Sequence, residues 1–103
     1  MQFGRVEGFV APLDDADGRW LRLTVTLETG RGRVEVVREE LVAVVRPIAG
    51  PADLAWHADQ YAQETIGVQL AAEGWEPIGA GELPEPEPNA PARSATWTVR
   101  RLG

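Results

Sequence analysis

The chain has 103 residues, enough for one domain around one hydrophobic core. It contains no cysteine, which excludes disulfides, thiolate metal sites and a cysteine nucleophile. The formal charge of -6 and the scatter of the ten basic residues, all of them arginine, argue against nucleic-acid binding, which needs clustered cations. The N-terminal sequence lacks a signal-peptide pattern, and no apolar run is long enough to span a membrane, so we expect a cytoplasmic protein. Abundant Ala, Gly and Arg without Lys suggest a bacterium with a GC-rich genome.

The first half of the chain has the patterns of β-strands. Residues 2–13 contain an apolar stretch that ends at a proline, and 14–18 (DDADG) are typical of a turn. Residues 20–28 (WLRLTVTLE) alternate between apolar and polar or amphipathic side chains, which predicts a strand with one buried face. Residues 29–32 (TGRG) predict a hairpin turn, so the second and third strands are expected to be antiparallel neighbours.

Residues 33–47 predict a third strand that contains an irregularity. Val34 and Val36 share one face, and Val42 and Val44 share one face further on. The alternation cannot continue through both Val36-Val37 and Glu39-Glu40. A bulge or bend near Glu39 would restore it.

Residues 52–74 predict one long helix. Asp53 suits the N-terminal dipole, and Gly74 suits the C-terminal stop. At about 100° per residue, one stripe forms on the helix surface, and a second apolar group lies away from it. The first stripe contains Leu54, Ala58, Tyr61, Thr65, Val68 and Ala72, and the second contains Trp56, Ile66 and Leu70.

After the helix, residues 75–81 predict a short strand that Pro77 and Gly79 confine to an edge or bend. Residues 82–92 are rich in Pro and Glu, with a flexible loop expected over 83–91, and 93–102 predict a final strand. The expected fold over 1–103 is therefore a single α+β domain. It is a two-layer sandwich of a mainly antiparallel sheet in the order β-β-β-α-β-β, with one helix on one face.

Trp75 stands directly after the expected helix end, where the chain returns toward the sheet, and we expect it to seal the core. The segment LAAEGWEPI, followed later by WTVRRL, resembles a widespread family of very short bacterial domains of unknown function. The resemblance covers about residues 60–102, and Pro77 departs from the family's usual apolar strand residue. It implies a helix followed by a strand hairpin and carries no assigned chemistry. The matching positions are Leu70, Glu73, Gly74, Trp75, Glu76, Arg100 and Arg101.

Evidence for catalysis is weak. His57 is the only histidine, and Asp53 could orient it as a base, but no nucleophile motif accompanies it, and an exposed helical histidine explains it as well. The chain has neither a zinc-ligand set nor a phosphate loop, so we predict no catalytic residue, metal or cofactor.

Three functions remain open. The preferred one is a non-catalytic interaction or assembly module, a homodimer or the binder of a protein partner, with Trp56, Ile66 and Leu70 in the interface. The alternative is a small-molecule-binding or accessory enzyme domain with a pocket between sheet and helix. The candidate ligand-binding residues are Trp20, Arg22, His57, Tyr61 and Trp97. A weaker alternative, based on charge alone, is an acidic inhibitor or immunity-type protein.

Overall fold

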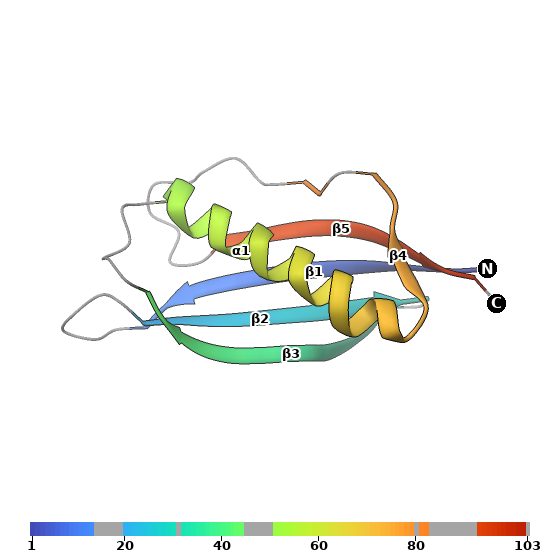
Figure 1. Cartoon of the computed structure of the whole chain (residues 1–103), viewed down its shortest axis with the longest axis horizontal. Coiled ribbons are helices and arrows are strands. Elements are labelled where there is room, and N and C mark those ends of the chain that lie inside the picture. The colour runs from blue at the N-terminus through green and yellow to red at the C-terminus, as the bar shows by residue number, and fades with distance from the viewer. Residues whose placement is uncertain (14–19, 31, 45–50, 80, 83–92, 103) are drawn as a thin grey trace.

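The computed structural model describes residues 1–13, 20–30, 32–44, 51–79, 81–82 and 93–102. They form an antiparallel sheet of strand order β3-β2-β1-β5-β4, with one helical segment across one face (Figure 1). This confirms the α+β class, the β-β-β-α-β-β order and the two-layer arrangement. The expected turn at 14–18 and the loop at 83–91 lie outside the described residues. The elements are β1 (Gln2–Pro12), β2 (Trp20–Thr29), β3 (Arg33–Ala43), α1 (Pro51–Thr65), the π-helical η1 (Ile66–Leu70), β4 (Trp75–Pro77) and β5 (Arg93–Arg101).

Strand β2 follows its sequence pattern along its whole length. Leu21, Leu23, Val25 and Leu27 are buried beneath the helix. The alternate residues Trp20, Arg22, Thr24, Thr26 and Glu28 face away from the helix. Strand β2 lies between β1 and β3, and residues directly opposite each other on neighbouring strands share a face. The alternation of β2 therefore shows which residues of β1 and β3 face the helix and which face away from it.

Strand β3 contains the irregularity that its sequence requires, two residues before the expected position. Val36 pairs with Thr26, whereas Arg38 pairs with Val25, so Val37 is the extra residue of a β-bulge. The Gln69 amide donates a hydrogen bond of 2.5 Å to the Val37 carbonyl, which links the bulge to the helical layer. Because the bulge reverses the alternation, it places Arg38 on the helix side of the sheet.

The burial of the helical side chains differs from the two stripes expected from the sequence. Ile66 and Leu70 are 3% and 0% exposed, whereas Val68 is 70% exposed. Two causes combine. Ala55 and Ala62 are also buried, and on a helix they lie within about 40° of Ile66, so the buried face is wider than the expected stripe and includes Ile66. The π-helical turn η1 then holds one more residue than an α-helical turn, which rotates the side chains that follow by about 100° and brings Leu70 toward the sheet and Val68 toward solvent. The expectation that Ile66 and Leu70 form an exposed interface is therefore wrong.

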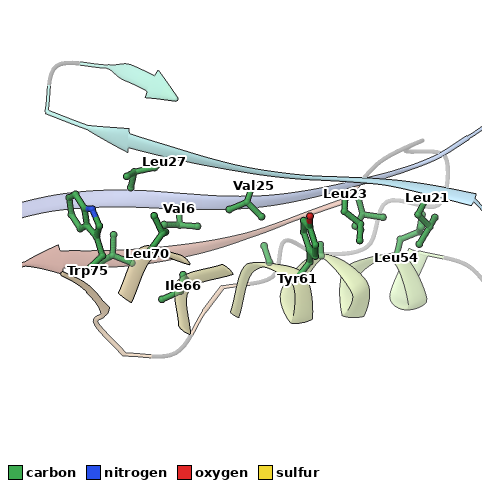
Figure 2. Close-up of a cluster of buried hydrophobic side chains, with 14 residues drawn as sticks. Val6, Leu21, Leu23, Val25, Leu27, Leu54, Tyr61, Ile66, Leu70 and Trp75 are labelled. Carbon is green, nitrogen blue, oxygen red and sulfur yellow. The ribbon is translucent and has the colours of Figure 1, made fainter. Parts of the chain in front are cut away.

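The core lies between the sheet and the helix, and Trp75 closes one end of it (Figure 2). Trp75 is 4% exposed, and the Arg101 guanidinium lies 5.0 Å from its ring centroid. Gly74 has a φ of 92° and turns the chain from the helix into β4. The predicted role of Trp75 in the core is confirmed.

The middle of the helix packs unusually close to the sheet because β1 carries a glycine there. A Cβ atom on Gly8 would lie 2.7 Å from both the Ala58 carbonyl oxygen and the Ala62 Cβ. Only glycine fits at that distance without moving the helix. The two alanines complete the close contact from the helical side.

Candidate functional site

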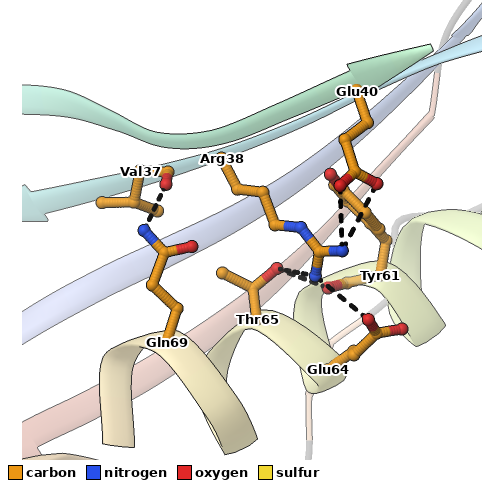
Figure 3. A network of polar contacts seen from close by, with 7 residues as sticks. All are labelled: Val37, Arg38, Glu40, Tyr61, Glu64, Thr65 and Gln69. Carbon is orange, nitrogen blue, oxygen red and sulfur yellow. Dashed lines mark hydrogen bonds and ion pairs between the residues drawn. The ribbon is translucent and has the colours of Figure 1, made fainter. Parts of the chain in front are cut away.

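A polar cluster joins β3 to the helix around Arg38 (Figure 3). Its Nη1 donates to Glu64 Oε1 at 3.2 Å and to Thr65 Oγ1 at 3.5 Å, and its Nη2 donates to the two Glu40 oxygens at 3.2 and 3.3 Å. The guanidinium also lies 4.4 Å from the Tyr61 ring centroid. Burial lowers the pKa of Arg38, but the hydrogen bonds to Glu40 and Glu64 outweigh it and raise the pKa. The side chain is therefore a fixed cation.

Tyr61 is the buried polar residue of this cluster. The side chain is 6% exposed, and its hydroxyl lies near the Glu40 carboxylate without a hydrogen bond of regular geometry to the residues that the structure describes. Burial raises the pKa of Tyr61 to about 12, against the opposing effect of Arg38, and the carboxylates of Glu40 and Glu64 add to the rise. A buried hydroxyl without a partner costs free energy, which is why it marks a position where a ligand could bind.

A recess of about 250 Å³ opens beside this cluster. Its lining contains both cationic and anionic side chains, and the Arg38 guanidinium is already paired with the Glu40 and Glu64 carboxylates. His57 enters from the helix, with its Nε2 4.0 Å from Asp53 Oδ1 and its ring 5.0 Å from that of Trp56. The lining residues are Leu23, Arg38, Glu40, Val42, His57, Gln60, Tyr61 and Glu64.

The structure brings together only two of the five predicted ligand-binding residues. His57 and Tyr61 line the recess between sheet and helix. Trp97 lies in a separate pocket of about 150 Å³ with Gln63, Ile66, Gly67 and Pro77, and its Nε1 has no partner among the described residues. Trp20 and Arg22 lie on the opposite face of the sheet, because they alternate with the buried residues of β2. The five candidates therefore lie in three separate places.

Sequence reasoning missed Arg38, Glu40 and Glu64. The broken alternation of β3 was the sequence feature that could have identified Arg38 and Glu40. A bulge at Val37, rather than near Glu39, puts both residues on the helix side. Glu64 then faces them from one turn beyond Gln60. The cluster offers fixed charges but no nucleophile. Within the described ranges no three His, Asp or Glu side chains gather to hold a metal.

The second candidate is the sheet face turned away from the helix, here called the open face. Six large apolar side chains are 40% to 59% exposed on it, and they come from β1, β2 and β3. Their assignment to one face follows from the register, in which Leu41 pairs with Arg22 and Val36 with Thr26. The six are Phe3, Phe9, Trp20, Val34, Val36 and Leu41.

Comparison of the chain with protein families, curated proteins and solved structures finds no match. The resemblance of residues 60–102 to a family of short bacterial domains therefore stays a prediction. In the part of the chain that the structure describes, no helix has the length and apolarity needed to cross a bilayer.

Proposed function

We propose that the chain is a non-catalytic assembly module of the bacterial cytoplasm that pairs with a second copy of itself through the open face. The observation that carries this proposal is the presence of six large, exposed apolar side chains on one sheet face, with charged residues such as Glu7 and Arg22 between them. Single exposed apolar residues are ordinary on a protein surface, but so many on one face, together with polar groups, are typical of an interaction surface.

The size of the open face supports the same proposal. Its four long strands, β3, β2, β1 and β5, make a surface about 19 Å wide and about 34 Å long, on the order of 600 Å² of flat area. A standard stable interface buries about 800 Å² of accessible surface on each partner. Accessible surface exceeds flat area because it follows the side chains, so one open face is large enough for such a contact.

The outer side of the helix is a weaker candidate. Of the three interface residues expected from the sequence, only Trp56 is exposed, at 57%, and Val68 joins it at 70%. These two positions are twelve residues apart, which separates them by about 18 Å along a helix. They are isolated apolar residues rather than a patch, so the dimer is assigned to the open face.

Solution mass with matched variants tests the proposal. The wild type is expected to be a dimer by light scattering at 100 µM, a concentration on the order of 100 times a micromolar dissociation constant. Leu41→Asp, on the open face, should give a folded monomer. Val68→Asp, similarly exposed on the helix, should stay a dimer. A monomeric wild type at this concentration would overturn the assembly function.

The unpartnered Tyr61 hydroxyl favours a second candidate function, binding of a small polar molecule in the recess beside Arg38. A ligand that accepts a hydrogen bond from the hydroxyl would remove the cost of its burial. Native mass spectrometry of the protein purified from a bacterial host tests this. A bound small molecule should appear with the wild type and be lost with Tyr61→Phe, and equal spectra free of any adduct would refute it.

A further inference from the structure

Building on this assembly function, we infer the register in which two copies meet: a two-fold axis lies in the plane between the open faces, perpendicular to the strands, and crosses β2 at Val25. This operation places Arg22 of each copy against Glu28 of the other. The inference rests on the proposed self-assembly and adds which residues recognise each other.

The register of β2 leads to this axis. Its open-face residues are Trp20, Arg22, Thr24, Thr26 and Glu28. A two-fold axis perpendicular to the strand exchanges positions equally far on either side of the crossing point. With the crossing at Val25, Arg22 meets Glu28 and Thr24 meets Thr26. Each dimer then contains two opposite-charge pairs, one on each side of the axis.

The neighbouring strand β3 agrees with the same axis, whereas on β1 the axis sets Glu7 against Phe9 of the second copy. On β3, Leu41 lies beside Arg22 and Val34 lies beside Glu28. The operation therefore sets Leu41 against Val34 of the second copy, and an apolar contact flanks each charge pair. Glu39 comes near Val36, but β3 is the edge strand of the sheet, so its carboxylate can remain in water.

The surface is also shaped for this contact. A depression of about 140 Å³ lies at the Glu28 end of the open face, and carboxylates of Glu7 and Glu28 line it together with Arg5, Thr26 and Val34. Arg5 lies 4.0 Å from Glu7, which leaves Glu28 as the carboxylate without an ion-pair partner among the described residues. Arg22 has none in that same set, and the second copy's Arg22 side chain enters this depression.

Other axes lose this complementarity. An axis parallel to the strands over β2 would set Arg22 against Arg22 and Glu28 against Glu28, and like charges in contact oppose association. Moving the perpendicular axis by one residue, to Thr24, would place Glu28 over Trp20 and Arg22 over Thr26. Packed sheets cross at about 30°, which shifts residues about 10 Å from the axis by about 5 Å, within the reach of an arginine side chain.

A charge exchange tests the register. Arg22→Glu and Glu28→Arg should each raise the dimer dissociation constant at least about tenfold in sedimentation equilibrium at low salt. The double variant should return to within about threefold of the wild type, because the pairs re-form with reversed sign. Arg33→Glu changes the charge equally at a position outside the proposed contact and should leave the constant unchanged.

The outcomes separate the two proposals. A wild-type dimer that Leu41→Asp dissociates, but whose affinity neither single exchange alters, would overturn the register and leave the assembly function standing. A double variant as weak as the single ones would also overturn the register. A monomeric wild type would overturn both. Circular dichroism spectra of all variants, expected to match that of the wild type, confirm that they are folded.

Discussion

The burial within the π-helical turn predicts that two nearby apolar residues differ in their contribution to stability. Ile66 and Val68 are two residues apart, and the first is buried whereas the second is exposed. Replacing each in turn by alanine therefore measures which side chain faces the sheet. Ala62, one turn before Ile66, is buried on the same side of the helix.

The burial of each side chain sets the magnitude. Ile66→Ala removes three carbon atoms from a residue that is 3% exposed, which costs about 2.4 kcal/mol at about 0.8 kcal/mol per buried methylene. The cavity left behind raises the total to about 3 to 4 kcal/mol. Val68→Ala removes two carbon atoms that are mostly in water, and the higher helix propensity of alanine offsets the small loss, so its stability should stay within about 0.5 kcal/mol of the wild type.

Urea denaturation followed by far-UV circular dichroism measures both values, provided that the slope of the free energy with urea stays constant across the variants. The reasoning predicts a large fall in the midpoint for Ile66→Ala and almost none for Val68→Ala. A large loss for Val68→Ala together with a small one for Ile66→Ala would contradict the burial of these two side chains.

Further predictions concern the close helix contact, the core aromatic and the buried tyrosine. Gly8→Ala should destabilise by about 2 kcal/mol or more, because the added methyl meets helix backbone, whereas Gly67→Ala, with open space around it, should be neutral or stabilise by up to about 1 kcal/mol in the same urea assay. Trp75→Ala should cost about 3 to 5 kcal/mol and Trp56→Ala less than about 1 kcal/mol, and equal losses would contradict the burial. Tyr61 is the only tyrosine, so absorbance at 295 nm should titrate near pH 12 in the folded chain and near 10 in urea. The pKa of Tyr61 is higher in the folded chain than in the unfolded chain, so the folded chain holds the tyrosine proton more tightly. This contribution to the free energy of unfolding is complete below pH 10 and is lost as the pH rises through 12. A Tyr61→Phe variant that loses stability over that range as the wild type does would refute the assignment.

The elements that the sequence predicted correctly are those with a strong local pattern. The alternation of β2 identifies its buried face, because a half-buried strand has a period of two residues. Gly74 followed by Trp75 marks the helix end, because glycine permits the positive φ that turns the chain there. Both signals lie within a few residues and do not depend on contacts with distant segments.

The remaining features depend on contacts that a local pattern does not contain. A π turn changes the helical period at one place, so a constant 100° per residue assigns Val68 and Leu70 to the wrong sides. A bulge can restore the alternation of β3 at more than one position, and its pairing with β2 decides that Val37 is the extra residue. Arg38 and Glu40 reach the helix side only because of that choice, which is why their part of the recess was not predicted.

Cross-linking through a single introduced cysteine tests self-assembly through the open face most directly, because the natural chain has no cysteine. Thr26→Cys places a thiol on the open face, and Gln63→Cys places one on the exposed side of the helix. With a short bis-maleimide reagent, the Thr26 variant should give a covalent dimer in high yield, and the Gln63 variant should remain almost entirely monomeric on a denaturing gel. Efficient cross-linking of the Gln63 variant without that of the Thr26 variant would contradict assembly through the sheet.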